Sequence, residues 1–196
     1  MSMPRIVDHE QRRRAISAAA CRVIAASGVA NTTVRDIAAE AGCTTGMVVH
    51  YFAGKREVLR AALAAASSTV AERVAAGISQ TTDLYALLGH FLPLDRTRTE
   101  EWRVWIAFRD SALQDEELAR DHRERYRAWH EGVRLVLITA GHRAGPALDE
   151  VAEALMVVID GIGIQAVFDP ERFTPERQLA LLRRQAECLL AELDPA

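Results

Sequence analysis

Residues 32 to 59 read TTVRDIAAEAGCTTGMVVHYFAGKREVL, and this stretch decides the fold of the N-terminal part of the chain. Thr33 and Thr44 each stand just before a run with apolar residues three and four positions apart, which is typical of helix N-caps. Asp36 follows Thr33 at the spacing of a capping box, and Gly42 between the two runs can adopt a left-handed turn. The stretch therefore predicts a helix-turn-helix, an arrangement whose second helix enters the major groove of DNA.

The remainder of the chain is predicted to be helical as well. One helix is expected from about Asp8 to Ser27, ended by Gly28, and a long one from Lys55 to about Ile78. Turn residues then divide the rest into five more helices, the last starting at Thr174 with Pro175 behind it. No stretch alternates like a β-strand. We expect an all-α fold of about nine helices.

The charges are divided unevenly along the chain, which has 196 residues, 49% of them hydrophobic, and a net charge of −3. Residues 1 to 60 carry a net charge of +4, and the remaining residues carry −7. A basic N-terminal part on an acidic body suits a protein that presents one end to phosphate groups. The alternative is a chance fluctuation in an arginine-rich chain.

Several classes of protein are disfavoured. The charged N-terminus lacks the apolar core of a secretory signal, and no apolar run approaches the roughly 20 residues that cross a bilayer. We expect a cytoplasmic protein without membrane contact. The three cysteines are odd in number and widely spaced, and no two of the six histidines stand three or four positions apart. No disulfide framework, metal site or cofactor is expected.

An enzyme is also disfavoured. Residues 161 to 166, GIGIQA, fit the dinucleotide-binding pattern G-x-G-x-x-A, but no strand precedes them and they lie inside a predicted helix. The sequence suggests no nucleophile with a base and no paired acids, so no catalytic residue is assigned. A helical adaptor without a DNA role stays open. Charge reversal on the N-terminal basic face would distinguish it, because an adaptor would not respond.

The segment from residue 32 to residue 59 resembles the DNA-binding segment of the TetR family of regulators. The matching residues are Thr33, Ile37, Ala38, Ala41, Gly42, Gly46, Tyr51, Phe52, Lys55 and Leu59. The resemblance implies a helix-turn-helix DNA-binding domain over residues 1–54 and a ligand-binding and dimerisation domain over residues 55–196. It also implies a repressor that a small-molecule inducer releases from a palindromic, double-stranded DNA operator.

The candidate DNA contacts follow from the resemblance and from side-chain chemistry. They are Thr33, Arg35, Thr44, Thr45, Gly46, Met47, Val49, His50, Tyr51 and Lys55. Arg35 has the geometry to pair with guanine, although a solvated surface arginine is the alternative. Val49 stands where many relatives have tyrosine, so an apolar contact with a thymine methyl replaces the phenol contact. His50 has two open interpretations, a phosphate contact and packing.

The two C-terminal helices are candidates for the homodimer contact that the family implies. Residues 148–168 are apolar on nearly all sides, and the following helix carries leucines at helical spacing. The predicted interface residues are Leu155, Ile159, Leu179, Leu182 and Leu189. The alternative is that these stripes belong to the core of a single subunit.

Most aromatic side chains of the C-terminal part fall in two predicted helices. The proposed ligand residues are Trp102, Trp105, Phe108, Tyr126, Trp129 and Asp160. The segments at 102–108 and 158–168 are similar to the subgroup that contains the choline-responsive betaine repressor. An aromatic cage with an acid nearby would suit a quaternary ammonium inducer through cation–π attraction. The alternative is that the aromatics are ordinary core.

Overall fold

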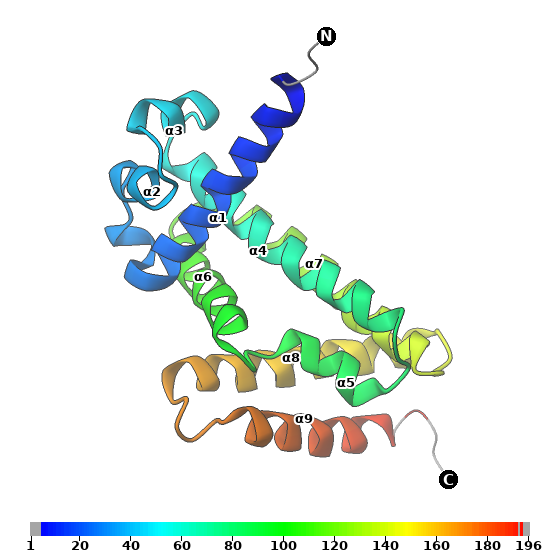
Figure 1. Cartoon of the computed structure of the whole chain (residues 1–196). Coiled ribbons are helices and arrows are strands. Elements are labelled where there is room, and N and C mark those ends of the chain that lie inside the picture. Colours follow the sequence, from blue (N-terminus) through cyan, green and yellow to red (C-terminus); the bar gives the residue numbers. More distant parts are fainter. Residues whose placement is uncertain (1–4, 192, 194–196) are drawn as a thin grey trace. The chain divides into compact units, whose positions relative to one another are not determined.

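A computed structural model describes residues 5–191 and 193. Within these residues the chain forms nine α-helices and one short 3-10 helix, joined by short loops, and no strand (Figure 1). The helices are α1 (Arg5–Asn31), α2 (Val34–Glu40), α3 (Thr45–Tyr51), α4 (Lys55–Ile78), α5 (Leu84–Leu88), η1 (Gly89–Phe91), α6 (Arg96–Ala112), α7 (Glu116–Thr139), α8 (Pro146–Phe168) and α9 (Pro175–Leu190). The all-α prediction is confirmed.

Local signals in the sequence placed several helix ends correctly, but α1 extends past both of its predicted ends and α8 begins at Pro146, ahead of Leu148. The bounds of α4 are those predicted, and Thr174 caps α9 by accepting the Arg177 N–H, with Pro175 behind it. α1 begins at Arg5, ahead of the expected start near Asp8. Gly28 interrupts α1 with φ +74°, but one further turn follows, so the helical segment ends at Asn31 and not at Ser27.

The chain divides into two compact units, residues 1–68 with 103–122 and residues 69–102 with 123–196. This division differs from the boundary predicted between residues 54 and 55. The reason is that the first half of α4 contributes Val58, Leu59 and Ala62 to the same core as α1, α2 and α3, and Val104 of α6 joins it. The N-terminal core therefore needs more of the chain than the helix-turn-helix alone.

The core of the first unit lies beneath the helix-turn-helix. Ile16 and Ile24 of α1 meet Ile37 of α2, Val48 of α3 and Phe52, all of them buried. Ala38 is also buried, as expected for a small residue between two closely packed helices.

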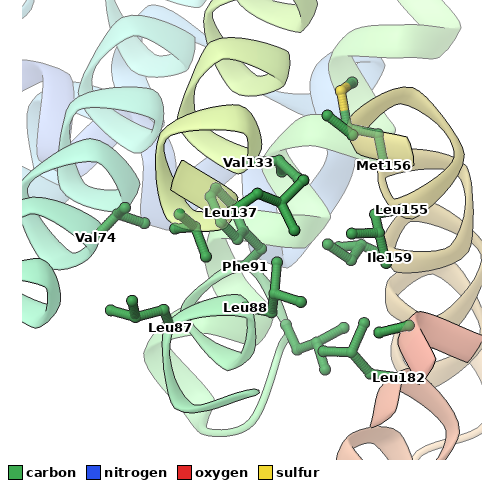
Figure 2. Close-up of a cluster of buried hydrophobic side chains, with 14 of the residues drawn as sticks. Val74, Leu87, Leu88, Phe91, Val133, Leu137, Leu155, Met156, Ile159 and Leu182 are labelled. Atoms are coloured by element: carbon green, nitrogen blue, oxygen red, sulfur yellow. The ribbon is translucent and has the colours of Figure 1, made fainter. Parts of the chain in front are cut away.

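The core of the second unit is built around α8. Its inward side carries Leu148, Leu155 and Ile159, and α8 lies beside α9, which contributes Leu182 (Figures 1 and 2). By length and composition α8 is also the one described helix that could cross a membrane, although no apolar run of that length was expected. Core helices of globular proteins can be equally long and apolar, and the buried residues of α8 identify it as a core helix.

Candidate functional site

The first helix of the helix-turn-helix is capped as predicted. The hydroxyl of Thr33 accepts the Asp36 N–H at 3.2 Å, and the Asp36 carboxylate accepts the Thr33 N–H at 3.0 Å. The Thr33 hydroxyl also donates to the Asp36 carboxylate at 2.6 Å. These hydrogen bonds to Thr33 hold the pKa of the Asp36 carboxyl below its usual value.

The turn and the second cap orient α3. Gly42 adopts φ +62°, and the Cys43 N–H donates to the Ala38 carbonyl at 2.9 Å. Thr44 then caps α3, its hydroxyl accepting the Met47 N–H at 3.2 Å. Both predictions, the left-handed turn at Gly42 and the N-cap at Thr44, are confirmed. The consequence is an exposed and capped N-terminal end of α3.

Most of the predicted DNA contacts are exposed. The exposed set is Thr33, Arg35, Thr44, Thr45, Gly46, Val49, His50 and Lys55. Val49 is a large apolar side chain with 61% of its surface exposed, which fits contact with another molecule better than a role in the core. Met47 and Tyr51 are half-buried against the N-terminal core, so they expose less of their surface than the other candidates.

Two further features of this surface were not predicted. The ring of His9, from α1, lies 4.5 Å from the ring of Tyr51, which in turn lies 5.3 Å from the ring of His50. No motif links His9 to α3, because the pairing depends on how α1 crosses α3. The Lys55 ammonium donates to the Ala30 carbonyl at 3.3 Å while its side chain stays exposed.

Four of the six predicted ligand residues gather in the second unit. The indole of Trp129 lies 5.9 Å from Trp102 and 5.4 Å from Tyr126, both edge-on, measured between ring centroids. The Tyr126 hydroxyl donates to the Asp160 carboxylate at 3.3 Å. Phe91, which the sequence analysis did not include, joins the group with its ring 6.2 Å from Trp129. We call Phe91, Trp102, Tyr126, Trp129 and Asp160 the aromatic cluster.

The other two predicted ligand residues belong to the first unit. Phe108 is buried with Leu63 and Leu118, and Trp105 packs against the same small core. The Trp105 ring also lies 6.4 Å from the ring of His122. Trp102 and Trp105 are one helical turn apart on α6, yet they pack in the cores of different units.

Three of the five predicted interface residues are buried within the subunit. Leu155, Ile159 and Leu182 point into the core of the second unit and have no more than 1% of their surface exposed (Figure 2). A partner chain has no access to such residues. Leu179 is exposed and Leu189 is half-buried. The interpretation that these stripes form a single subunit's core is therefore correct for the inner residues.

The outer side of α8 carries an apolar stripe whose residues were not among those predicted for the interface. Val157 is 66% exposed and Phe168 is 71% exposed, while Gly161 between them faces open space. Ala154, Val158 and Ile164 border this stripe and are half-buried. Because α8 is apolar on nearly all sides, hydrophobicity alone did not reveal which side faces outward.

Comparison with known proteins agrees with this geometry. Residues 16–62 match the model for bacterial regulatory proteins of the tetR family, and residues 80–191 match the BetI-type transcriptional repressor C-terminal domain. The chain is 28% identical to the regulator PksA of Bacillus subtilis, over 97% of this chain and 95% of PksA. It is 26% identical to BetI of Burkholderia mallei, over 96% and 98% of the two chains.

Solved structures show the same fold. A transcriptional regulator from Rhodococcus sp. Rha1 superposes with a TM-score of 0.77 at 29% identity, covering 94% of this chain and 98% of that one. A regulator from Saccharomonospora viridis, solved in complex with choline, also gives a TM-score of 0.77, at 24% identity with coverage of 91% and 96%.

Proposed function

Since the chain belongs to the TetR family of bacterial regulators and carries a BetI-type repressor C-terminal domain, we propose which of its residues bind the operator, the inducer and a second copy of the chain. The protein is a ligand-responsive, DNA-binding transcriptional regulator and not an enzyme. In our proposal α3 binds a palindromic operator, a quaternary ammonium compound is the inducer, and two copies of the chain pair through α8 and α9. An operator on the chromosome implies that the protein acts in the cytoplasm.

The observation that carries the DNA-binding role is the exposed and capped N-terminal end of α3. Residues at this end of a recognition helix reach base edges in the major groove. Thr45 and Gly46 lie there, and Val49, one turn further on, offers methyl groups to a thymine methyl. In the proposal Thr44, just before α3, and Lys55, the first residue of α4, contact phosphate groups, which position the protein but do not specify sequence.

The aromatic cluster supports a cationic inducer. Aromatic ring faces attract a quaternary ammonium group, and the Asp160 carboxylate adds an opposite charge beside the Tyr126 hydroxyl. The choline found in the Saccharomonospora viridis regulator belongs to the same chemical class. The proposal keeps Trp102, Tyr126, Trp129 and Asp160 as ligand residues and assigns Trp105 and Phe108 to the core of the first unit.

The outer stripe of α8 supports the homodimer. Two large apolar side chains on one exposed helix face are unusual for a surface that only meets water. In a two-fold dimer the same stripe on both chains would be covered at once. We therefore move the proposed contact from Leu155, Ile159 and Leu182 to Val157, Gly161 and Phe168, with Leu179 and Leu189 on the neighbouring helix.

The test begins with selection of DNA duplexes by the purified protein from a random pool. Fluorescence anisotropy with the enriched duplex then measures operator affinity with and without choline. A preference of choline for the non-binding state by about 100-fold corresponds to roughly 2.7 kcal/mol of coupling, and operator affinity should fall accordingly. Asp160→Asn should keep operator affinity and lose the choline response.

The matched control is Glu171→Gln, because Glu171 is an exposed acid outside the aromatic cluster and its loss changes the net charge by the same amount. This variant should respond to choline like the wild type. Equal operator affinity with and without saturating choline would reject the proposed inducer. Failure of the wild type to enrich any duplex would reject the assignment of α3 as a base-reading helix.

A further inference from the structure

Arg13 of α1 makes two contacts at the C-terminal end of α3 and one with the first turn of α4. Its Nη1 donates to the carbonyl of Tyr51, the last residue of α3, at 2.7 Å. Its guanidinium carbon lies 4.5 Å from the centre of the Phe52 ring. Its Nη2 donates to the Glu57 carboxylate at 2.9 Å. One side chain thus links the ends of α3 and α4 to α1.

Glu57, in the first turn of α4, completes the arrangement. Its second carboxylate oxygen accepts the Ala53 N–H, two residues beyond α3, at 2.7 Å. This backbone hydrogen bond, together with the one from Arg13, holds the pKa of the Glu57 carboxyl below its usual value. The pair Arg13 and Glu57 therefore takes up one carbonyl and one N–H at the end of α3.

These contacts meet a specific need of α3. A helix of seven residues is too short to be stable by itself, and its last carbonyls have no partner within the helix. Thr44 orders the N-terminal end, and Val48 and Phe52 anchor α3 to the core. The packing of two apolar side chains tolerates small rotations of a short helix, whereas directional hydrogen bonds from one planar guanidinium to the Tyr51 carbonyl and the Glu57 carboxylate do not.

We propose that Arg13 and Glu57 are positioning residues for operator binding, which hold the C-terminal end of α3 so that its exposed residues meet the base edges in register. Neither side chain contacts DNA in this role. The inference rests on the assignment of α3 as the recognition helix. It predicts that loss of either partner weakens operator binding through geometry, not through charge.

The charge of Glu57 provides the sharpest test. Removing a negative charge near the DNA surface should strengthen binding if only electrostatics matters. Our proposal predicts the opposite sign for Glu57→Gln. Arg13→Gln and Glu57→Gln should each weaken binding to the selected duplex by about tenfold or more, the size expected for lost charge-assisted hydrogen bonds. The affinity of the double variant for the duplex should fall by less than the product of the two single fold-changes, because both residues act in one unit.

The dependence of affinity on salt separates positioning from phosphate contact. Lys55→Ala removes a proposed phosphate contact and should flatten the slope of log affinity against log salt by about 0.9. Arg13→Gln should leave that slope at the wild-type value. Arg14→Gln is the matched control: Arg14 is the next residue of α1 and pairs with Glu10 on the same helix, away from α3. Arg14→Gln loses the same charge as Arg13→Gln and should bind the selected duplex far more tightly than that variant.

Hydrogen exchange of the free protein gives a readout that involves no DNA. Amides of residues 45–53 should exchange faster in Glu57→Gln than in the wild type, while those of α1 and α4 should be unchanged. Arg13→Lys, which keeps the charge but loses the planar guanidinium that bridges two acceptors, should show the same pattern and only partial recovery of affinity.

Two results would overturn the proposal. One is operator binding by Glu57→Gln as tight as that of the wild type, or tighter. The other is a flattened salt slope in Arg13→Gln like that of Lys55→Ala, which would make Arg13 a phosphate contact. If α3 were not the recognition helix, Thr45→Ala would leave the base preference unaltered. That failure is distinguishable from failure of the positioning role, because every comparison uses a duplex that the wild type binds.

Discussion

At the scale of single residues, Gly163 shows how closely the aromatic cluster packs against α8. A Cβ atom at this position would overlap the indole ring of Trp102, which is buried and donates its Nε1–H to the Phe91 carbonyl at 3.0 Å. Gly163→Ala should therefore displace the indole and cost about 1–3 kcal/mol, as overpacking of a core does. Urea unfolding at fixed protein concentration measures this loss.

The matched control for Gly163→Ala is Gly132→Ala in the interior of α7. A Cβ atom there would lie 3.5 Å from the Phe91 ring, an ordinary van der Waals contact. This substitution should be neutral or stabilising by up to about 1 kcal/mol, because alanine has the better helix propensity. Equal stability of the two variants would show that Trp102 yields easily and does not depend on the small residue in α8.

At the scale of secondary-structure elements, α8 has two apolar sides with different roles. The inner side fills the core, and the outer side carries Val157 and Phe168. Val157→Glu combined with Phe168→Glu should give a folded monomer, since charges would be buried without partners in the proposed interface. Sedimentation measures the mass, and circular dichroism verifies the helix content. The monomer should also lose specific operator binding, because a dimer binds two half-sites about one helical turn apart.

Leu135→Glu is the control for the α8 variant, because Leu135 is an exposed apolar residue of α7 in the same unit. It should leave the mass of the assembly unchanged. Leu182→Glu should behave differently from both, since a charge in the core of the second unit would unfold that unit and not merely separate two chains. A wild-type protein that sediments as a monomer at micromolar concentration would contradict the dimer.

At the scale of the whole molecule, the proposed DNA and ligand residues lie in different compact units, and α4, α6 and α7 each contribute residues to both. If choline weakens operator binding, thermodynamic linkage requires the operator to weaken choline binding by the same factor. Calorimetric titration of choline with and without the selected duplex should therefore give the ratio that anisotropy gives for DNA. Unequal ratios at equilibrium would mean that a third state, such as free monomer, takes part.

The sequence by itself determined the features that depend on neighbouring residues. The capping box at Thr33, the left-handed turn at Gly42, the N-cap at Thr44 and the bounds of α4 all follow from short-range hydrogen bonds and backbone sterics. These features were enough to predict where α2 and α3 begin and how the turn between them is made.

Only the tertiary structure decided which side of each helix faces inward. Sequence periodicity did not distinguish Leu155 from Val157 on α8, because this helix is apolar on both sides. Periodicity did not assign Trp102 and Trp105 to different cores. It also did not pair Arg13 with the Tyr51 carbonyl, 38 positions away. Burial and such long-range hydrogen bonds depend on contacts between residues far apart in the chain, and these exist only once the helices have packed.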